Sequence, residues 1–259
     1  MSTSDDILLV ERLGHVLRLS LNRPERRNAV NDDLILRLKS AFEAATNDND
    51  IRAIVLTGAG DKAFCSGADL VGGVFEFDYS EPRSNYAMML RAAMATTLPI
   101  IGRINGFCLA GGMGLLAVCD MAVASTTAKF GLPEVKVGLF PMQVAALMQS
   151  MIPPRKFAEM CYTGEMLDAT EALECGLVNY IVDPDELDAK TDWLVERVVS
   201  KSPSAIRRGK YALNATSGMT FEQSLAYMES QIGLMPQTED AREGLAAFAE
   251  KRAPKWTGK

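Results

Sequence analysis

The sequence of 259 residues contains a single histidine, His15, and its five cysteines are odd in number. The cysteines form no CxxC pair and have no histidine at ligand spacing, so neither a zinc site nor a disulfide framework is indicated. Ser66 lies in a loop that would suit a nucleophile, but nothing ties it to His15, which argues against serine hydrolysis. We therefore expect free thiols in a reducing cytoplasm and no bound metal.

The sequence also lacks an excess of positive charge and a long hydrophobic run. Its net charge is −6 and its isoelectric point is near 5.0, which leaves no basic field for nucleic acid or anionic lipid. The longest apolar stretch, 108–123, is interrupted by glycines and Asp120 and is too short to span a bilayer. Residues 1–6 are polar and acidic, unlike a secretory signal. We expect a cytoplasmic protein with neither a nucleic-acid nor a membrane partner.

Apolar, strand-like runs alternate with segments of helical periodicity along most of the chain. The runs at 7–12 and 15–21 predict a hairpin, and those at 51–57 and 99–104 fit interior strands. Asn31 is placed to cap the helix that follows it. With 48% hydrophobic residues, the chain can bury one substantial core. Strands alternating with helices predict an α/β fold.

The last quarter of the chain has a different character. From residue 186 onward only helical periodicity remains, with helix starts predicted at Ser202, Thr220 and Thr238. We therefore divide the chain into an α/β core, residues 1–195, and a helical lobe, residues 196–259. Because these helices have no large apolar core of their own, we expect them to pack against a neighbouring subunit.

A glycine-rich stretch follows the apolar run that ends at residue 104. Residues 105–114 read Asn-Gly-Phe-Cys-Leu-Ala-Gly-Gly-Met-Gly, which predicts a tight loop and then a buried helix with glycines in its first turn. Glycine lets a ligand approach the bare backbone, and the first N–H groups of a helix have no partners of their own. The stretch is therefore predicted to hold a developing negative charge.

Two further motifs accompany this stretch in a fixed order. One is Ser-Gly-Ala-Asp at 66–69, and the other is Pro133-Glu134 followed by Gly138 and Pro141. Together with the Asn-Arg-Pro loop at 22–24 and the C-terminal segment 247–252, they resemble the crotonase superfamily, the enoyl-CoA hydratases and isomerases. The resemblance covers nearly the whole chain. It implies a crotonase (ClpP-like) spiral of β-β-α repeats with a helical C-terminal trimerisation lobe, assembled as a homotrimer or homohexamer.

The resemblance also implies an oxyanion hole made of the backbone N–H groups of Ala68 and Gly111. Both residues lie in small-residue loops after predicted strands, where a thioester carbonyl can approach the backbone. An enolate forms when the α-proton is removed or a nucleophile adds at the β-carbon, and the two donors meet its charge. Loss of one such donor typically raises a barrier by about 2.7–4 kcal/mol. The alternative for these small residues is close helix–strand packing alone, which is as good an account of Gly112 and Gly114.

Glu134 is the candidate general acid/base. It lies between Pro133 and the apolar run 135–140, so its carboxyl group is expected in dry surroundings that raise its pKa. The family pattern places one of two catalytic glutamates at this position. The alternative is a solvated glutamate near Lys136.

The sequence departs from the hydratase pattern at two places. Gly114 occupies the position of the other glutamate, and Met142 replaces a glycine. Both changes suit a one-base Δ3,Δ2-enoyl-CoA isomerase, whose single carboxylate takes a proton and returns it to another carbon. Some similar bacterial members with this glycine are assigned as hydratases of branched or glutaconyl-type CoA esters, and for such a reaction a substrate carboxylate or Gln143 of this chain is expected to help place the water. A third alternative is an acyl-CoA-binding homologue without catalysis.

Coenzyme A is the implied handle of the substrate, and no separate cofactor is expected. The resemblance assigns its contacts to the two N-terminal loops, the start of two helices and the C-terminal helix, namely Arg26, Arg27, Ala68, Asp69, Leu70, Gly112, Met142, Phe248 and Lys251. The last two are expected to reach the nucleotide across a subunit boundary. Asp69 is expected to orient its loop. The aperiodic segment 71–83 is expected to be a mobile loop.

Overall fold

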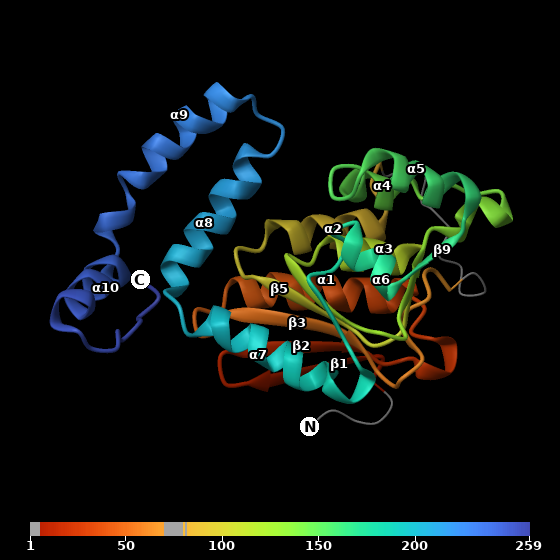
Figure 1. The fold of residues 1–259 in the computed structure, drawn as a ribbon, viewed down its shortest axis with the longest axis horizontal. Coiled ribbons are helices and arrows are strands. Elements are labelled where there is room, and N and C mark those ends of the chain that lie inside the picture. The colour runs from red at the N-terminus through yellow and green to blue at the C-terminus, as the bar shows by residue number, and fades with distance from the viewer. Residues whose placement is uncertain (1–5, 70–79, 81) are drawn as a thin grey trace.

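The computed structural model describes residues 6–69, 80 and 82–259, and it arranges the strands in two sheets (Figure 1). The larger sheet has the order β1-β2-β3-β5-β7-β10, and the smaller one β4-β6-β8-β9. Their bounds are β1 Leu8–Leu13, β2 Val16–Leu21, β3 Ala53–Gly58, β4 Ala63–Cys65, β5 Ile100–Ile104, β6 Phe107–Leu109, β7 Met121–Ser125, β8 Lys129–Gly131, β9 Met166–Asp168 and β10 Tyr180–Val182. The segment predicted to be a mobile loop, 71–83, lies largely outside the described residues, as does Leu70.

The predicted hairpin is confirmed, since β1 and β2 pair antiparallel around a turn at Gly14. Every other neighbouring pair in the larger sheet is parallel. Successive strands alternate between the sheets: β3, β5 and β7 enter the larger one, and β4, β6 and β8 the smaller one. A helix follows each of the first two pairs, and a helical segment follows the third. The predicted β-β-α repeat is therefore present.

The helices begin where the sequence supplies caps. Asn31, Ser202, Thr220 and Thr238 each accept a hydrogen bond from a backbone N–H of the first turn, as predicted. The helices are α1 Asp32–Thr46, α2 Asn85–Ala95, α3 Gly111–Ala117, α4 Met142–Met148, α5 Pro154–Thr163, α6 Ala169–Glu174, α7 Leu187–Val199, α8 Pro203–Thr216, α9 Phe221–Ile232 and α10 Glu239–Glu250. Four short 3-10 helices are also present among the described residues: η1 Pro24–Arg26, η2 Pro133–Val137, η3 Pro184–Glu186 and η4 Met235–Gln237.

The hydrophobic core lies between the two sheets and the helices α1 to α3. Phe42 of α1, Phe64 of β4 and Phe130 of β8 are its largest fully buried side chains. The other face of the larger sheet is covered by α7, whose Leu187 and Leu194 pack on β3, β5 and β7. The predicted boundary at 195/196 falls within α7. The part of this helix that packs on the larger sheet belongs to the core. Burial on both faces explains why β3 begins with four apolar residues in a row, 53–56.

Helices α8 to α10 extend away from the sheets (Figure 1). The lobe is joined to the core mainly through α8, where Lys210 forms an ion pair with Asp120 at 2.7 Å and Arg207 donates to the Ile51 carbonyl at 2.8 Å. Helix α9 has no buried residue. The lobe therefore presents apolar side chains that this single chain leaves uncovered. Among the described residues, no helix combines the length and apolarity needed to cross a bilayer.

The C-terminal tail folds back onto the lobe around one buried carboxylate. Asp240 is 1% exposed and accepts hydrogen bonds from the backbone N–H groups of Ser204, Thr257 and Gly258, and from the Ser202 hydroxyl. Although burial alone would raise the pKa of Asp240, these donors together lower it to about 2. The ionised group thus joins the start of α8, the start of α10 and the tail.

Replacing Asp240 by Asn should lower the thermal midpoint and remove part of the acid sensitivity. Because the pKa is lower in the folded chain than in the unfolded one, its contribution to stability is complete above about pH 4 and is lost as the pH falls toward 2. The contribution amounts to roughly 2 kcal/mol at neutral pH. Thermal unfolding between pH 7 and 3 measures this contribution. The control is Asp185→Asn, which removes the same charge from an exposed residue. Equal midpoints for both variants at pH 7 would contradict the role given to Asp240.

Candidate functional site

Three loops meet at one edge of the smaller sheet. Strands β4, β6 and β8 are adjacent and parallel, with Cys65 opposite Cys108 and Leu109 opposite Gly131. Because parallel strands end on the same side, the segments after them emerge together. These segments are 66–69, 110–111 and 132–134, so the three predicted motifs all leave the sheet at this edge.

The first two of these loops are in contact. A Cβ built on Gly67 would lie 3.4 Å from the Gly111 nitrogen, and one built on Gly111 would lie 3.8 Å from the Ala68 nitrogen. The Ala68 N–H points away from the ladder with Val30, because the bridge uses the Gly67 carbonyl and the Asp69 N–H. Within the part of the chain that the structure describes, neither the Ala68 nor the Gly111 N–H has a hydrogen-bond acceptor. Two unpaired amides therefore lie side by side.

The backbone at this point is strained. Ala110 has φ 49° and ψ −121°, a conformation that residues with a Cβ rarely adopt and that costs about 1–3 kcal/mol. Its N–H donates to the Gly131 carbonyl at 2.9 Å, which ties the loop to the end of β8. Opposite it, Gly67 has φ 99°, and a Cβ there would lie 2.7 Å from that of Ala110. Close approach of the two loops thus requires glycine at position 67.

An ion pair holds the first loop. Asp69 accepts from Arg23 at 2.7 Å, and both side chains are largely buried, at 11% and 13% exposure. Arg23 also donates to the Ala29 carbonyl at 2.6 Å. One arginine side chain of the Asn-Arg-Pro loop thus contacts both Ala29 and Asp69. The ion pair joins the first loop to the Asn-Arg-Pro loop, and the orienting role of Asp69 stays a prediction. Arg23 was not singled out by the sequence reasoning, because a loop arginine alone does not indicate a partner 46 residues away.

Glu134 occupies the third loop, in η2. The residue is half-buried, and its Oε2 atom is buried and has no hydrogen-bond partner among the described residues. Burial raises the pKa of its carboxyl above the ordinary value, while a backbone hydrogen bond partly opposes the rise. Lys136 does not neutralise it, since that ammonium pairs with Glu165 at 3.1 Å. A buried carboxyl oxygen without a hydrogen-bond partner is available to accept a proton.

Comparison with known proteins identifies the arrangement. The model of the enoyl-CoA hydratase/isomerase family matches residues 11–259. The chain belongs to the enoyl-CoA hydratase/isomerase family. It is 36% identical to the (E)-benzylidenesuccinyl-CoA hydratase of Thauera aromatica, with 96% of this chain and 98% of that relative covered. It is 32% identical to the crotonyl-CoA hydratase of Syntrophomonas wolfei, with 97% and 98% covered.

Solved structures agree with this assignment. The enoyl-CoA hydratase of Bacillus anthracis matches with a TM-score of 0.91 and 30% identity, covering 98% of this chain and all of that one. The enoyl-CoA hydratase of Mycobacterium smegmatis matches with a TM-score of 0.89 and 32% identity, covering 97% and 99%. The predicted crotonase fold and superfamily membership are confirmed, and the protein is an enzyme of the lyase or isomerase type.

The other predicted site residues lie in varied surroundings. Gly112 faces β4, where an added Cβ would lie 2.3 Å from the Cys65 carbonyl oxygen, so close packing requires its lack of a side chain. Met142 begins α4 and is 72% exposed. Arg26 and Arg27 are exposed in the Asn-Arg-Pro loop. Phe248, 86% exposed, lies on α10, and Lys251 caps its end, far along the lobe from the smaller sheet (Figure 1).

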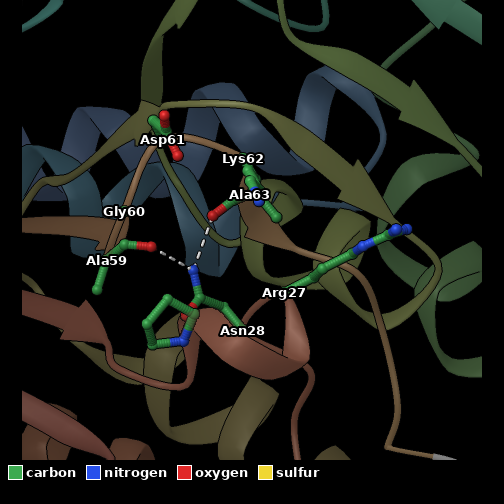
Figure 2. Close-up of a pocket in the computed structure, with 8 residues that line it drawn as sticks. Arg27, Asn28, Ala59, Gly60, Asp61, Lys62 and Ala63 are labelled. Carbon is green, nitrogen blue, oxygen red and sulfur yellow. Dashed lines mark hydrogen bonds between the residues drawn. The ribbon is translucent and has the colours of Figure 1, made fainter.

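A cavity of about 210 Å³ lies between the Asn-Arg-Pro loop and the segment 59–63. Figure 2 shows the side-chain amide of Asn28 directed between the Ala59 and Ala63 carbonyls, to which it donates at 2.9 and 2.7 Å, while Arg27 extends away. Asn28 is fully buried with φ 55°. The cavity does not include Ala68, Gly111 or Glu134. Asn28 therefore shapes the loop that carries Arg26 and Arg27.

Replacing Gly67 by Ala should disrupt the contact between the two amide loops. The strained φ and the 2.7 Å approach to Ala110 together should lower the free energy of unfolding by roughly 2 kcal/mol or more. Urea denaturation measures this loss. Gly209→Ala is the matched control, because Gly209 lies in α8 with open space around it, and alanine there should stabilise the helix by about 0.5–1 kcal/mol. Equal urea midpoints for Gly67→Ala and the wild type would contradict the packing described for this loop.

Proposed function

We propose that this protein acts on an enoyl-CoA thioester, adding water to its double bond or shifting that bond, with Glu134 as the acid/base. The N–H groups of Ala68 and Gly111 would receive the thioester oxygen as an enolate forms. The observation that carries the proposal is that the two unpaired amides and the unpaired Oε2 of Glu134 belong to segments that leave the smaller sheet at the same edge. Coenzyme A enters as part of the substrate, and no separate cofactor is proposed.

One carboxylate can serve either reaction. In the isomerase, Glu134 takes a proton from C2 of a 3-enoyl thioester, the electron pair moves onto the thioester oxygen, and the carboxylic acid returns the proton to C4. In the hydratase, Glu134 takes a proton from water as the water oxygen bonds to C3. The same proton is then delivered to C2 as the enolate collapses. Atoms and charge balance in both. The proposed task of the two amides is identical, because both routes pass through the enolate.

Different observations favour the two reactions. Gly114, which supplies no second carboxyl group, favours the one-base Δ3,Δ2-enoyl-CoA isomerase. Relatives named crotonyl-CoA hydratase and (E)-benzylidenesuccinyl-CoA hydratase favour hydration. For that reaction, a branched or glutaconyl-type CoA ester is the substrate that we propose for a site with Gly114. The absorbance of the conjugated thioester separates them: it falls when a trans-2-enoyl-CoA is hydrated and rises when a 3-enoyl-CoA is isomerised. A non-catalytic acyl-CoA-binding homologue would change neither.

Glu134→Gln should lower kcat by at least about 100-fold on the preferred substrate, because the amide cannot accept the proton. Both absorbance assays measure turnover, and deuterium wash-in at the α-carbon of a saturated acyl-CoA measures enolate formation directly. Glu186→Gln is the control, an exposed glutamate at the end of η3. Unchanged turnover and wash-in for Glu134→Gln would refute Glu134 as the acid/base.

The dependence of kcat/KM on pH should report the ionisation of Glu134. Because burial raises the pKa of its carboxyl, the acid limb of the profile should have its midpoint above the ordinary glutamate value of about 4.3. Activity requires the ionised form and should fall as the pH drops through that midpoint. A limb at or below the ordinary value, measured with a slowly reacting substrate, would contradict the buried position given to the carboxyl.

We propose further that the C-terminal lobe assembles a homotrimer or homohexamer, and that residues 1–195 hold the acyl-CoA site. Phe248 and Lys251 lie far from the smaller sheet of their own chain, so a contact with the nucleotide would come from a neighbouring subunit. The exposed Arg26 and Arg27 are proposed to bind the phosphates of coenzyme A. Contacts with the rest of the acyl-CoA are proposed for Asp69, Leu70, Gly112 and Met142. The five free thiols support a cytoplasmic location.

The wild-type protein should therefore sediment as a trimer or a hexamer at micromolar concentration. Ile232 is 68% exposed on α9, which this chain leaves uncovered, so Ile232→Glu should shift the protein toward monomers. Analytical ultracentrifugation measures the mass. Leu13→Glu is the control, since Leu13 is 56% exposed at the hairpin turn of the core. A wild-type monomer at 10 μM, or assembly unaffected by Ile232→Glu, would contradict this role for the lobe.

A further inference from the structure

The Tyr86 side chain lies over the first turn of α3, beside Gly114, which has no side chain. Tyr86 is the second residue of α2, and its hydroxyl donates to the Gly111 carbonyl at 2.5 Å. A Cβ built on Gly114 would lie 2.1 Å from that hydroxyl oxygen and 3.2 Å from the ring carbon that carries it. The phenol therefore fills the space that any side chain at position 114 would need. The sequence motifs did not point to it, because α2 is separated from α3 by β5 and β6.

The helix that carries Tyr86 is held in place at its start. Ser84 caps α2 by accepting from the Ala87 N–H, and its hydroxyl also accepts from the Gln143 amide at 2.6 Å. Gln143 belongs to α4, which packs on α3. The start of α2 is thus linked through Gln143 to the helix that covers α3. This link fixes the ring of Tyr86 over Gly111 and Gly114.

The hydroxyl acts on the Gly111 half of the amide pair. Gly111 lacks a Cβ and follows the strained Ala110, so its backbone has fewer steric restraints on its conformation than that of a residue with a side chain. On one side the Ala110 N–H is held by the Gly131 carbonyl at 2.9 Å, and on the other the Gly111 carbonyl is held by Tyr86. The two bonds bracket the Gly111 N–H. Preorganised donors stabilise a developing oxyanion more than donors that must reorient.

We infer that Tyr86 is a positioning residue of this site: its hydroxyl aims the Gly111 N–H at the enolate oxygen, and Tyr86 and Gly114 form an interlocked pair that keeps the site to one carboxylate. This inference rests on the proposed enolate chemistry and names a further residue for it. Burial, with Cys65, Cys108 and Glu134 nearby, raises the pKa of the Tyr86 hydroxyl well above its usual range. The hydroxyl is therefore a neutral donor at working pH and leaves proton transfer to Glu134.

Tyr86→Phe is the first test. Loss of one positioning hydrogen bond should lower kcat and the rate of α-deuterium wash-in about tenfold, while KM changes less than about twofold, because the substrate still binds. Tyr180→Phe is the matched control. It removes the same atom from β10, on the far sheet, and should leave both rates unchanged.

Gly114→Ala is the second test. In the wild-type background the new methyl group displaces the hydroxyl, so kcat should fall at least as far as in Tyr86→Phe. In the Tyr86→Phe background the hydroxyl is already absent, so the same substitution should lower kcat further by less than about threefold. Strong non-additivity is thus expected of an interlocked pair. Thermal midpoints of all four proteins show whether the rates merely follow stability.

The outcomes distinguish this inference from the proposed function. A wild-type protein that shows neither turnover nor wash-in refutes the enolate chemistry, and the role of Tyr86 with it. A wild-type protein that is active, with Tyr86→Phe retaining its kcat and wash-in rate, refutes only the role of Tyr86. Additive losses from Tyr86→Phe and Gly114→Ala refute the interlock. A fall in kcat that follows a fall in thermal midpoint identifies a structural residue and overturns the positioning role.

Discussion

The parallel pairing of β4, β6 and β8 is the constraint on which the site depends. Each strand has only three residues, yet their side-by-side register delivers Ala68, Gly111 and Glu134 to one edge from positions that span 67 residues of chain. The larger sheet makes this possible, because its strands β3, β5 and β7 are each followed by a strand of the smaller sheet. Covering both faces of the larger sheet, with α1 on one side and α7 on the other, fixes its strands firmly enough to set the positions of short ones.

Polar groups around this edge are satisfied selectively. Arg23 and Asp69 form an ion pair, and Asn28 donates to two carbonyls, so these three supporting side chains have partners within the chain. At the proposed site, two amides and the Glu134 Oε2 atom are without partners among the described residues, where Asn105 Oδ1 and Arg208 Nε are the other buried side-chain atoms without one. Unsatisfied buried groups are costly, as is the backbone conformation of Ala110. Their concentration at one place, within a well-satisfied frame, is typical of a binding or catalytic site.

Sequence patterns predicted local features well and non-local ones poorly. The caps at Asn31, Ser202, Thr220 and Thr238 were predictable because a cap acts on its own first turn. The superfamily followed from three ordered motifs, and membership is confirmed. Strands of three residues are too short to show a period, so β4, β6 and β9 escaped notice, and with them the reason that the motifs converge. Arg23 and Tyr86 escaped for a related reason, since their partners are set by tertiary packing.

The glycine at position 114 has a structural explanation that composition alone could not supply. In the sequence, Gly114 indicates only that a carboxylate is missing. A glycine with no neighbour over it would leave a space beside Gly111 open to water. In the structure the Tyr86 hydroxyl occupies that space and bonds to the Gly111 carbonyl. The two residues therefore have to be considered together, because a side chain at 114 excludes the tyrosine rotamer, and the tyrosine excludes the side chain.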